Sequence, residues 1–347
     1  AKQFGSTMTR NVTLPLLAVG AGALKLAVDF EDAFAKIDGL VGGFTDGELE
    51  RMKASVLGMA HETAQAPGKL ADALYFVTSA GFDAAEALEV VEASAKAATS
   101  GLGDTATIAD AVTSVVNAYG KANITAAEAI DVMTGAIAVG KFEAEALAPV
   151  LGRIVPIASA MGIEFDQVGG ILAVMSKSGL DASEAVTSLR GIMTQLLSPS
   201  EQAKNLYSQL GTSIEDVRKR VADDGLLPVL RDLWEQTGRN QSAFAVLFPE
   251  VRGLAGAMNV LGQDAGSVDR AMAQVADSTG MSDRAFRIMT ETAGYKMKQA
   301  LADLQTEGIK LGDTLVPIAL ALVGHLQSLL MMWRELPGPI KQVTLVG

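Results

Sequence analysis

The sequence contains no cysteine, and only two of its 347 residues are histidines, His61 and His325. The lack of cysteine excludes disulfides, thiolate metal sites and cysteine nucleophiles. Aromatic residues make up 5% of the chain, whereas hydrophobic residues as a whole make up 49%. A core must therefore be built from Ala, Val, Leu, Ile and Met, a set that suits closely packed helices.

Basic residues are also scarce, since 28 Lys and Arg stand against 40 Asp and Glu, for a net charge of −12. Nucleic-acid binding draws its affinity from clustered Lys and Arg that displace counterions, and no run of five basic residues occurs. We therefore expect no specific nucleic-acid binding. The length is enough for two domains of ordinary size, and enough to bury a core.

Helix starts are marked by capping boxes, in which an N-cap oxygen and a carboxylate three residues later satisfy two backbone amides reciprocally. A convincing β-hairpin pattern is absent. In the fifth of six predicted boxes, Pro199 would occupy the first helical position. The predicted boxes are Thr45 with Glu48, Asp83 with Glu86, Thr125 with Glu128, Asp181 with Glu184, Ser198 with Glu201, and Ser213 with Asp216.

Behind these starts, apolar residues recur at spacings of three and four, which predicts amphipathic helices of about 12–18 residues. Glycines close many of the periodic stretches, as left-handed residues after a helix would. We expect all-α architecture: a compact multi-helix array of short antiparallel helices, without a fixed-period repeat, followed by longer, more extended C-terminal helices. The predicted closing glycines are Gly81, Gly120, Gly140, Gly162, Gly179 and Gly211.

The last third differs from the rest. Ala285–Gly312 has helical apolar spacing and predicts one helix of about 42 Å, which passes through Pro317 into an apolar segment. We therefore divide the chain into an apolar N-terminal helix (1–40), a compact helical core (41–280), and a long helix with an apolar helical segment (281–347). Because the chain starts without Met and stops inside an apolar run, we expect a fragment truncated at its C-terminus.

Two apolar segments raise the question of a membrane. Val12–Val28 is shorter than the roughly 20 apolar residues that span a bilayer, and we expect a buried helix. Leu315–Trp333 is nearly uncharged and long enough, but His325, Gln327 and Ser328 make insertion costly. We expect a helix buried by partner helices there, with possible host-membrane contact through this segment as the alternative.

Three short motifs resemble chemical sites without completing them. Gly135–Phe142 nearly matches a phosphate-binding loop, but Phe142 replaces the required hydroxyl and a helix replaces the preceding strand. Gly20-Ala21-Gly22 lacks the third glycine of a dinucleotide site, so close helix packing is the better explanation. After His61-Glu62, Gln65 stands where a zinc-protease helix requires its second histidine.

The histidines do not suggest catalysis either. We expect a surface His61 and a partly buried, hydrogen-bonded His325, and no nucleophile elbow accompanies them. Most carboxylates fall at helix N-termini, where the helix dipole explains them. The sequence therefore predicts no catalytic, cofactor-binding or metal-binding residue, no cofactor and no enzymatic activity.

Residues 70–210 carry a specific resemblance to a known family. Leu70–Phe82, Ala93–Gly101 and Leu147–Ala158 resemble the region shared by phage tail tape-measure proteins, and Ser178–Ala185, running on to Gln195–Ser200, is the strongest stretch. A looser likeness continues outside this range, at Thr13–Pro15 with Phe30-Glu31 and at Gly312–Pro317 with Leu336-Pro337.

The resemblance implies a structural virion protein of a phage or prophage. Such a protein is packed in the lumen of the tail tube, sets the length of the tail during assembly in the host cytoplasm, and is ejected before the DNA at infection. The implied partners are the tail tube protein, tail assembly chaperones and tail-tip or baseplate proteins, together with further copies of the chain.

Two other functions remain open at this stage. One is a membrane-active helical pore former or translocator that inserts Leu315–Trp333. The other is the non-catalytic part of a peptidoglycan-degrading tail protein.

Overall fold

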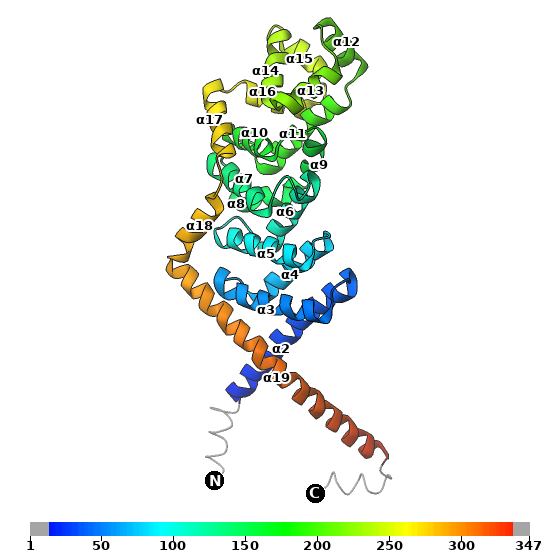
Figure 1. Ribbon diagram of the computed structural model, residues 1–347, viewed down its shortest axis with the longest axis vertical. Coiled ribbons are helices and arrows are strands. Elements are labelled where there is room, and N and C mark those ends of the chain that lie inside the picture. Colours follow the sequence, from blue (N-terminus) through cyan, green and yellow to red (C-terminus); the bar gives the residue numbers. More distant parts are fainter. Residues whose placement is uncertain (1–13, 336–347) are drawn as a thin grey trace.

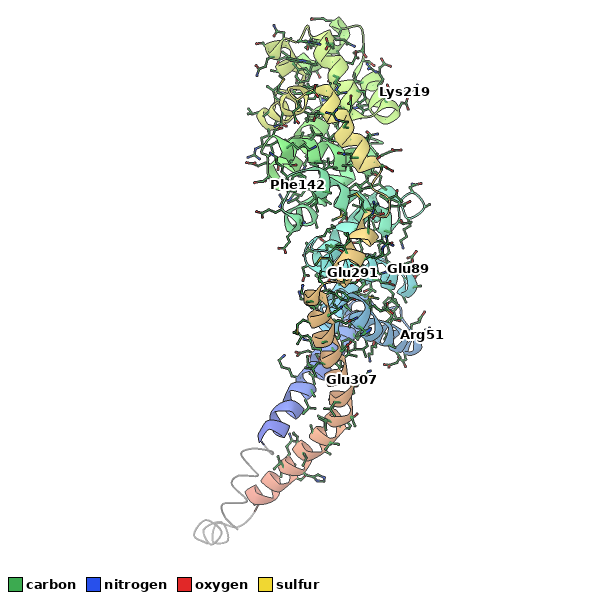
Figure 2. All side chains as sticks on the ribbon, turned by 90° about the vertical axis from the view of Figure 1, so that its left-hand side faces the viewer. Arg51, Glu89, Phe142, Lys219, Glu291 and Glu307 are labelled. Carbon is green, nitrogen blue, oxygen red and sulfur yellow. The ribbon has the colours of Figure 1, made fainter. Side chains whose placement is uncertain are left out.

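The computed structural model describes residues 14–335, and within this range the chain forms helices and no strand, which confirms the all-α prediction. The helices stack in layers along one long axis, and the chain returns along one side of the stack through its last three helices (Figure 1). Figure 2 shows Glu291 and Glu307 on this returning side, and the final helix continues beyond Glu307 past the end of the stack.

Most helices are short, and the last is the longest. The N-terminal helix α2 (Leu14–Lys36) continues into a π-helical turn η2 (Ile37–Val41). The stack consists of α3 (Asp46–Thr63), α4 (Pro67–Ser79), α5 (Ala84–Thr99), α6 (Thr105–Tyr119), α7 (Ala126–Val139), α8 (Ala144–Leu151), α9 (Val155–Ala160), α10 (Phe165–Lys177), α11 (Ala182–Leu197), α12 (Glu201–Gln209), α13 (Ile214–Asp224), α14 (Leu226–Gln236), α15 (Gln241–Leu247) and α16 (Val251–Leu261). The returning helices are α17 (Ala265–Ala276), α18 (Met281–Thr290) and α19 (Ala293–Glu335).

Five of the six predicted capping boxes are present, at Thr45, Asp83, Thr125, Asp181 and Ser213. At Thr125 the backbone amide donates to Glu128 Oε2 at 2.8 Å, and the Glu128 amide donates to Thr125 Oγ1 at 3.2 Å. The backbone bond from Thr125, and then the bond from its hydroxyl, lower the pKa of Glu128 below its usual value. Local sequence thus fixes where these helices begin.

The sixth prediction, a box at Ser198 with Pro199 as the first helical residue, is wrong. Ser198 instead ends α11, because a residue that precedes proline is driven out of the helical conformation. The N-cap of α12 is Ser200, whose hydroxyl accepts from the amide of Ala203 at 3.1 Å.

The prediction of left-handed glycines after helix ends is confirmed at five of six positions. Gly81, Gly120, Gly162, Gly179 and Gly211 all have φ between 70° and 98°. Gly140 has φ of −82°, so the left-handed prediction is wrong there. A Cβ at Gly140 would lie 2.6 Å from Ser176 Oγ and 3.2 Å from Ala173 Cα, so this glycine serves the close approach of α10.

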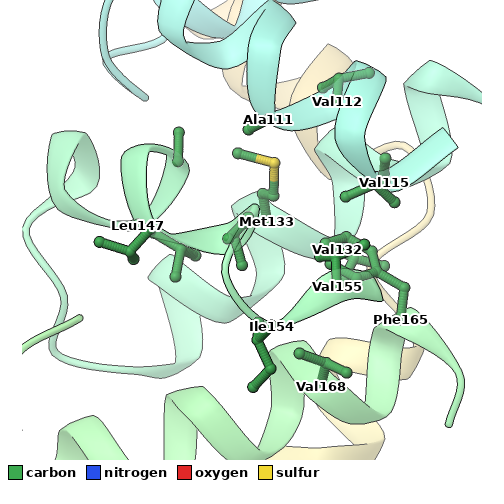
Figure 3. Close-up of a cluster of buried hydrophobic side chains, with 14 of the residues drawn as sticks. Ala111, Val112, Val115, Val132, Met133, Leu147, Ile154, Val155, Phe165 and Val168 are labelled. Carbon is green, nitrogen blue, oxygen red and sulfur yellow. The ribbon is translucent and has the colours of Figure 1, made fainter. Parts of the chain in front are cut away.

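One continuous cluster of buried apolar side chains runs from Phe30 in α2 to Ile309 in α19. Figure 3 shows a section of it, where Val132 and Val155 lie between Val115 of α6 and Phe165 of α10. Nearly all of these side chains are aliphatic, as the low aromatic content requires. Such a core depends on short distances between helix backbones.

The long helix expected over Ala285–Gly312 is divided in the structure. α18 ends at Thr290 and α19 begins at Ala293. Thr292 separates them, because its hydroxyl accepts from the amide of Tyr295 at 3.1 Å and so satisfies a free donor at the start of α19. From there α19 runs without interruption through Pro317, as predicted.

We predict that Ser200→Ala lowers the free energy of unfolding by about 1 kcal/mol, because it removes the oxygen that caps α12. Ser198→Ala, two residues earlier on an exposed side chain, is the matched control and should change it by less than about 0.5 kcal/mol. Urea denaturation followed by circular dichroism measures both. Equal losses would contradict the assignment of Ser200 as the cap.

Candidate functional surface

The segment that nearly matches a phosphate-binding loop, Gly135–Phe142, takes part in helix packing. Gly135 lies inside α7, and a Cβ there would lie 2.8 Å from Ser278 Cβ. At the end of the motif Phe142 is buried, and the amide of Lys141 donates to Ser176 Oγ at 2.8 Å. This amide is therefore already bonded within the fold and does not line an open anion cradle.

The two histidines lie far apart in separate surroundings. His61, on α3, is exposed as predicted, and its Nδ1 lies 2.8 Å from Asp303 Oδ1 on α19. His325 was predicted to be partly buried and is instead exposed, because α19 has left the stack at that point. It lies 22 residues beyond Asp303, which is about 33 Å of helix. Among the side chains that the structure describes, no group of three His, Asp or Glu is suited to a metal ion.

The returning helices are fastened to the stack by a buried carboxylate, Asp131 of α7. It is 7% exposed and accepts from the amide of Gly280 at 2.6 Å, the amide of Ser282 at 2.9 Å and the hydroxyl of Ser282 at 2.6 Å. These amides belong to the first turn of α18, so Asp131 caps a helix almost 150 residues away in sequence. Its negative charge also lies at the positive end of the α18 helix dipole, which is a favourable interaction.

The first half of α19 is fastened to the end of α3 by polar contacts. The hydroxyl of Tyr295 donates to the carbonyl of Glu62 at 2.6 Å, and Gln299 Nε2 donates to the carbonyl of His61 at 3.1 Å. Burial, and then the nearby carboxylates of Glu62 and Asp303, raise the pKa of Tyr295 above its usual value. The hydroxyl therefore remains protonated and keeps its role as a donor.

Further along, α19 crosses α2 backbone against backbone (Figure 1). A Cβ on Gly312 would lie 2.5 Å from Ala27 Cβ, and the carbonyl oxygen of Ala23 is closer still. A Cβ on Gly308 would lie 2.9 Å from Leu26 Cδ1. The glycines that allow this crossing therefore lie on α19.

The prediction that Gly20 and Gly22 serve close helix packing is wrong. A Cβ on either residue would meet nothing within 4 Å. The buried face of α2 is formed instead by Ala23, Ala27 and Phe30.

Beyond the crossing, the apolar segment Leu315–Trp333 leaves the other helices of the chain. Leu315, Val316 and Ala319 are still half-buried, whereas every residue from Leu320 to Ser328 is exposed. Ile318, Leu320, Leu322 and Leu326 are each at least 55% exposed. We predicted a helix buried by partner helices, but the other helices of this chain do not bury these residues. By length and composition, Ala293–Ser328 is long and apolar enough to cross a bilayer, and 11% of its most apolar window is buried.

Sequence reasoning assigned no role to Asp131 or to the exposed face of α19. The signal for Asp131 was a single carboxylate within the apolar run Ala129–Val139, on a helix whose start was already explained by Thr125 and Glu128. Its partner lies too far along the chain for local patterns to identify.

We predict that Asp131→Ala releases the start of α18, because it leaves buried amides without an acceptor, at a cost of about 1–3 kcal/mol. Amide hydrogen exchange at residues 280–284 should accelerate about fivefold to 100-fold. Asp72→Ala removes an exposed carboxylate from α4 and is the control. Unchanged exchange at residues 280–284 in Asp131→Ala would contradict the capping role.

Comparison with known proteins finds matches over the stacked helices. The model of the family described as phage-related minor tail protein matches residues 53–249, more than half of the chain. The tape measure protein of Pneumococcus phage Dp-1 is 27% identical over 248 residues, which cover 72% of this chain and 21% of that protein. A probable tape measure protein of Clostridium phage phiCD119 is 27% identical over 186 residues, which cover 51% of this chain and 20% of that protein.

No solved structure matches the chain. The chain spans about a fifth of the length of the curated relatives that it matches. Both relatives carry the tape-measure name, and the family model covers the stack from within α3 to beyond α15. The chain therefore belongs to the family of phage-related minor tail proteins, among the tape-measure proteins of phage tails.

Proposed function

We propose that this chain is a structural part of a tail tape measure, which sets tail length during assembly and leaves the tube before the DNA at infection. The observation that carries the proposal is the family match over residues 53–249, made to a chain whose described range contains helices and no strand. Helices have a fixed rise per residue, so a helical chain converts residue number into length.

The stacked conformation is too short to serve as that ruler. As one continuous helix the 347 residues would extend on the order of 500 Å, whereas the stack folds the same residues into many short layers. We therefore propose that the stack is the form before loading or after ejection, and that the chain is uncoiled inside the tube. The connections at Gly81, Gly120 and Gly179 would then be the points that straighten.

The proposed location is the lumen of the tail tube in the virion, and the host cytoplasm during assembly. The proposed partners are the tail tube protein, tail assembly chaperones and tail-tip or baseplate proteins. A net charge of −12 supports this placement, because an acidic filler does not hold DNA back. The proposed role is structural and requires no catalytic residue.

We also propose the division into residues 1–40, 41–280 and 281–347 as functional units. The middle unit contains the family match, all of the stacked helices from α3 to α16, and the returning helix α17. The last unit contains α18 and α19. α19 binds the end of α3 through polar contacts of Tyr295 and Gln299, and it packs closely on α2 at Gly308 and Gly312.

Membrane contact through Leu315–Trp333 is the second candidate function. It is supported by the exposure of Ile318, Leu320 and Leu322 and by the apolar length of the helix. Leakage of liposomes that disappears when residues 315–333 are deleted would favour it.

Tail length measured by electron microscopy tests the tape-measure proposal. In a phage that encodes the chain within its tail gene, deleting residues 41–280 should shorten the tail by about 360 Å, at about 1.5 Å for each of the 240 residues.

Replacing the same residues with Glu-Ala-Ala-Ala-Lys repeats of the same total number of residues is the matched control, because it restores helical length without the fold. This replacement should restore the original tail length. Tails of unchanged length after the deletion, or short tails after the replacement, would contradict the proposal.

A further inference from the structure

The returning part of the chain contains a stretch without a buried residue. Ser278 is 2% exposed against Gly135 of α7, and Tyr295 is 7% exposed at the end of α3. Every residue between these two is exposed or half-buried, and within α18 Ile288 is 64% exposed. We call this stretch, residues 279–294, the bridge.

The bridge joins two segments that are packed closely on the rest of the molecule. Before it, α17 buries Ala271 and Val275, and a Cβ on Gly170 of α10 would lie 3.3 Å from the Cα of Met272. After it, α19 crosses α2 backbone against backbone at Gly312. Close packing therefore holds the chain on both sides of the bridge, whereas the bridge itself has few buried contacts to hold it.

The bridge also spans successive layers of the stack (Figure 1). α18 lies beside α7 and α5, and α19 runs on beside α3 to α2. The connections at Gly81 and Gly120 lie in the chain between α3 and α7, so they can straighten only if these layers part. Because a helix has a fixed rise, α7 and α3 are kept together as long as α18 stays folded between its two packed neighbours.

Side chains that satisfy the free ends of helices hold the bridge at both of its ends. At its start, the carboxylate of Asp131 accepts three bonds from the first turn of α18. At its end, the carbonyls of His61 and Glu62 accept from the side chains of Gln299 and Tyr295. When such bonds open, water replaces the lost partner, so a few of them fix a position without making its release difficult.

Melting of the bridge would lengthen it. Its 16 residues span about 24 Å at the helical rise and about 55 Å when extended. The gain of about 30 Å is on the order of three helix layers, since packed helices lie about 8–10 Å apart. The layers α3, α5 and α7 could then separate while α17 and α19 stay packed where they are.

We infer that the bridge is a built-in release: it opens as one unit before any layer of the stack, and its opening lets the layers α3, α5 and α7 part. The purpose of the release rests on the proposed function, because a chain that extends inside a tube must separate its layers. The release itself is a property of the chain in solution. Its test therefore does not involve tail assembly, and either proposal can fail while the other stands.

Amide hydrogen exchange of the full chain in urea, below the unfolding transition, tests the order of opening. Amides of residues 281–290 should exchange at least about tenfold faster than the urea-dependent amides of α5 and α7, after correction for their intrinsic rates. Exchange in the bridge that is no faster than in α5 and α7 would overturn the inference.

A staple that keeps α18 helical tests whether the bridge controls the layers. Because the chain has no cysteine, Asp283→Cys with Arg287→Cys gives one reactive pair on exposed positions one turn apart, which a xylene linker joins. The linker restricts the open state, so exchange in α5 and α7 should slow about tenfold relative to the same variant before linking. Exchange in α11 and α16, which lie beyond the layers that the bridge spans, should not change.

The matched control is Glu215→Cys with Lys219→Cys on α13, joined by the same linker. It also replaces one acidic and one basic exposed residue four positions apart. This staple should leave exchange in α5 and α7 unchanged, and circular dichroism checks that both stapled chains keep their helix content. Equal slowing by both staples, slowing of α11 and α16 together with α5 and α7, or no slowing by the α18 staple would overturn the inference.

Discussion

The helices of this chain meet at places where the backbone of one lies against the backbone of another. A Cβ on Gly191 of α11 would lie 3.0 Å from the Cα of Gly253 on α16, and a Cβ on Gly140 at the end of α7 would lie 3.2 Å from the Cα of Ala173 on α10. With 5% aromatic residues and no cysteine, the core has neither large rings nor crosslinks to bridge wider gaps. Close approach through glycine and alanine is what allows small aliphatic side chains to fill the interior at native density.

The same constraint explains how the chain can return along its own stack. α17 lies against Gly170 of α10, the segment before α18 lies against Gly135 of α7, and α19 crosses α2 at Gly312. Polar contacts then set the register of the returning helices. Asp131 caps α18, and Tyr295 binds the end of α3. The returning helices are therefore held at defined points, with the second half of α19 left free.

Local features of the fold could be predicted because their causes lie within a few residues. The boxes at Asp83 and Asp181 need only a carboxylate three residues later, so the helix starts followed directly from the sequence. The error at Ser198 arose because Glu201 follows it at the spacing of a capping box, whereas the actual cap, Ser200, has Ala203 at that spacing. Only the effect of proline on the residue before it distinguishes the two serines.

Features that depend on tertiary packing could not be predicted in this way. Gly140 looked like a helix end, but α10 determines its role. Asp131 is bonded to residues about 150 positions away, and no periodicity records that pairing. The composition of Leu315–Trp333 was evident from the sequence, whereas its exposure depends on where α19 leaves the stack. The candidate surface therefore emerged only when the fold was known.

The claim that close glycine contacts hold the stack together is tested most directly by comparing Gly191→Ala with Gly58→Ala. A methyl group at Gly191 would overlap Gly253 and Glu250, whereas a methyl group at the exposed Gly58 of α3 meets nothing within 4 Å. Measured by urea denaturation, the free energy of unfolding should fall by about 1–3 kcal/mol for Gly191→Ala. It should rise by up to about 1 kcal/mol for Gly58→Ala, since alanine favours the helix. Changes of the same sign at the two positions would contradict the account.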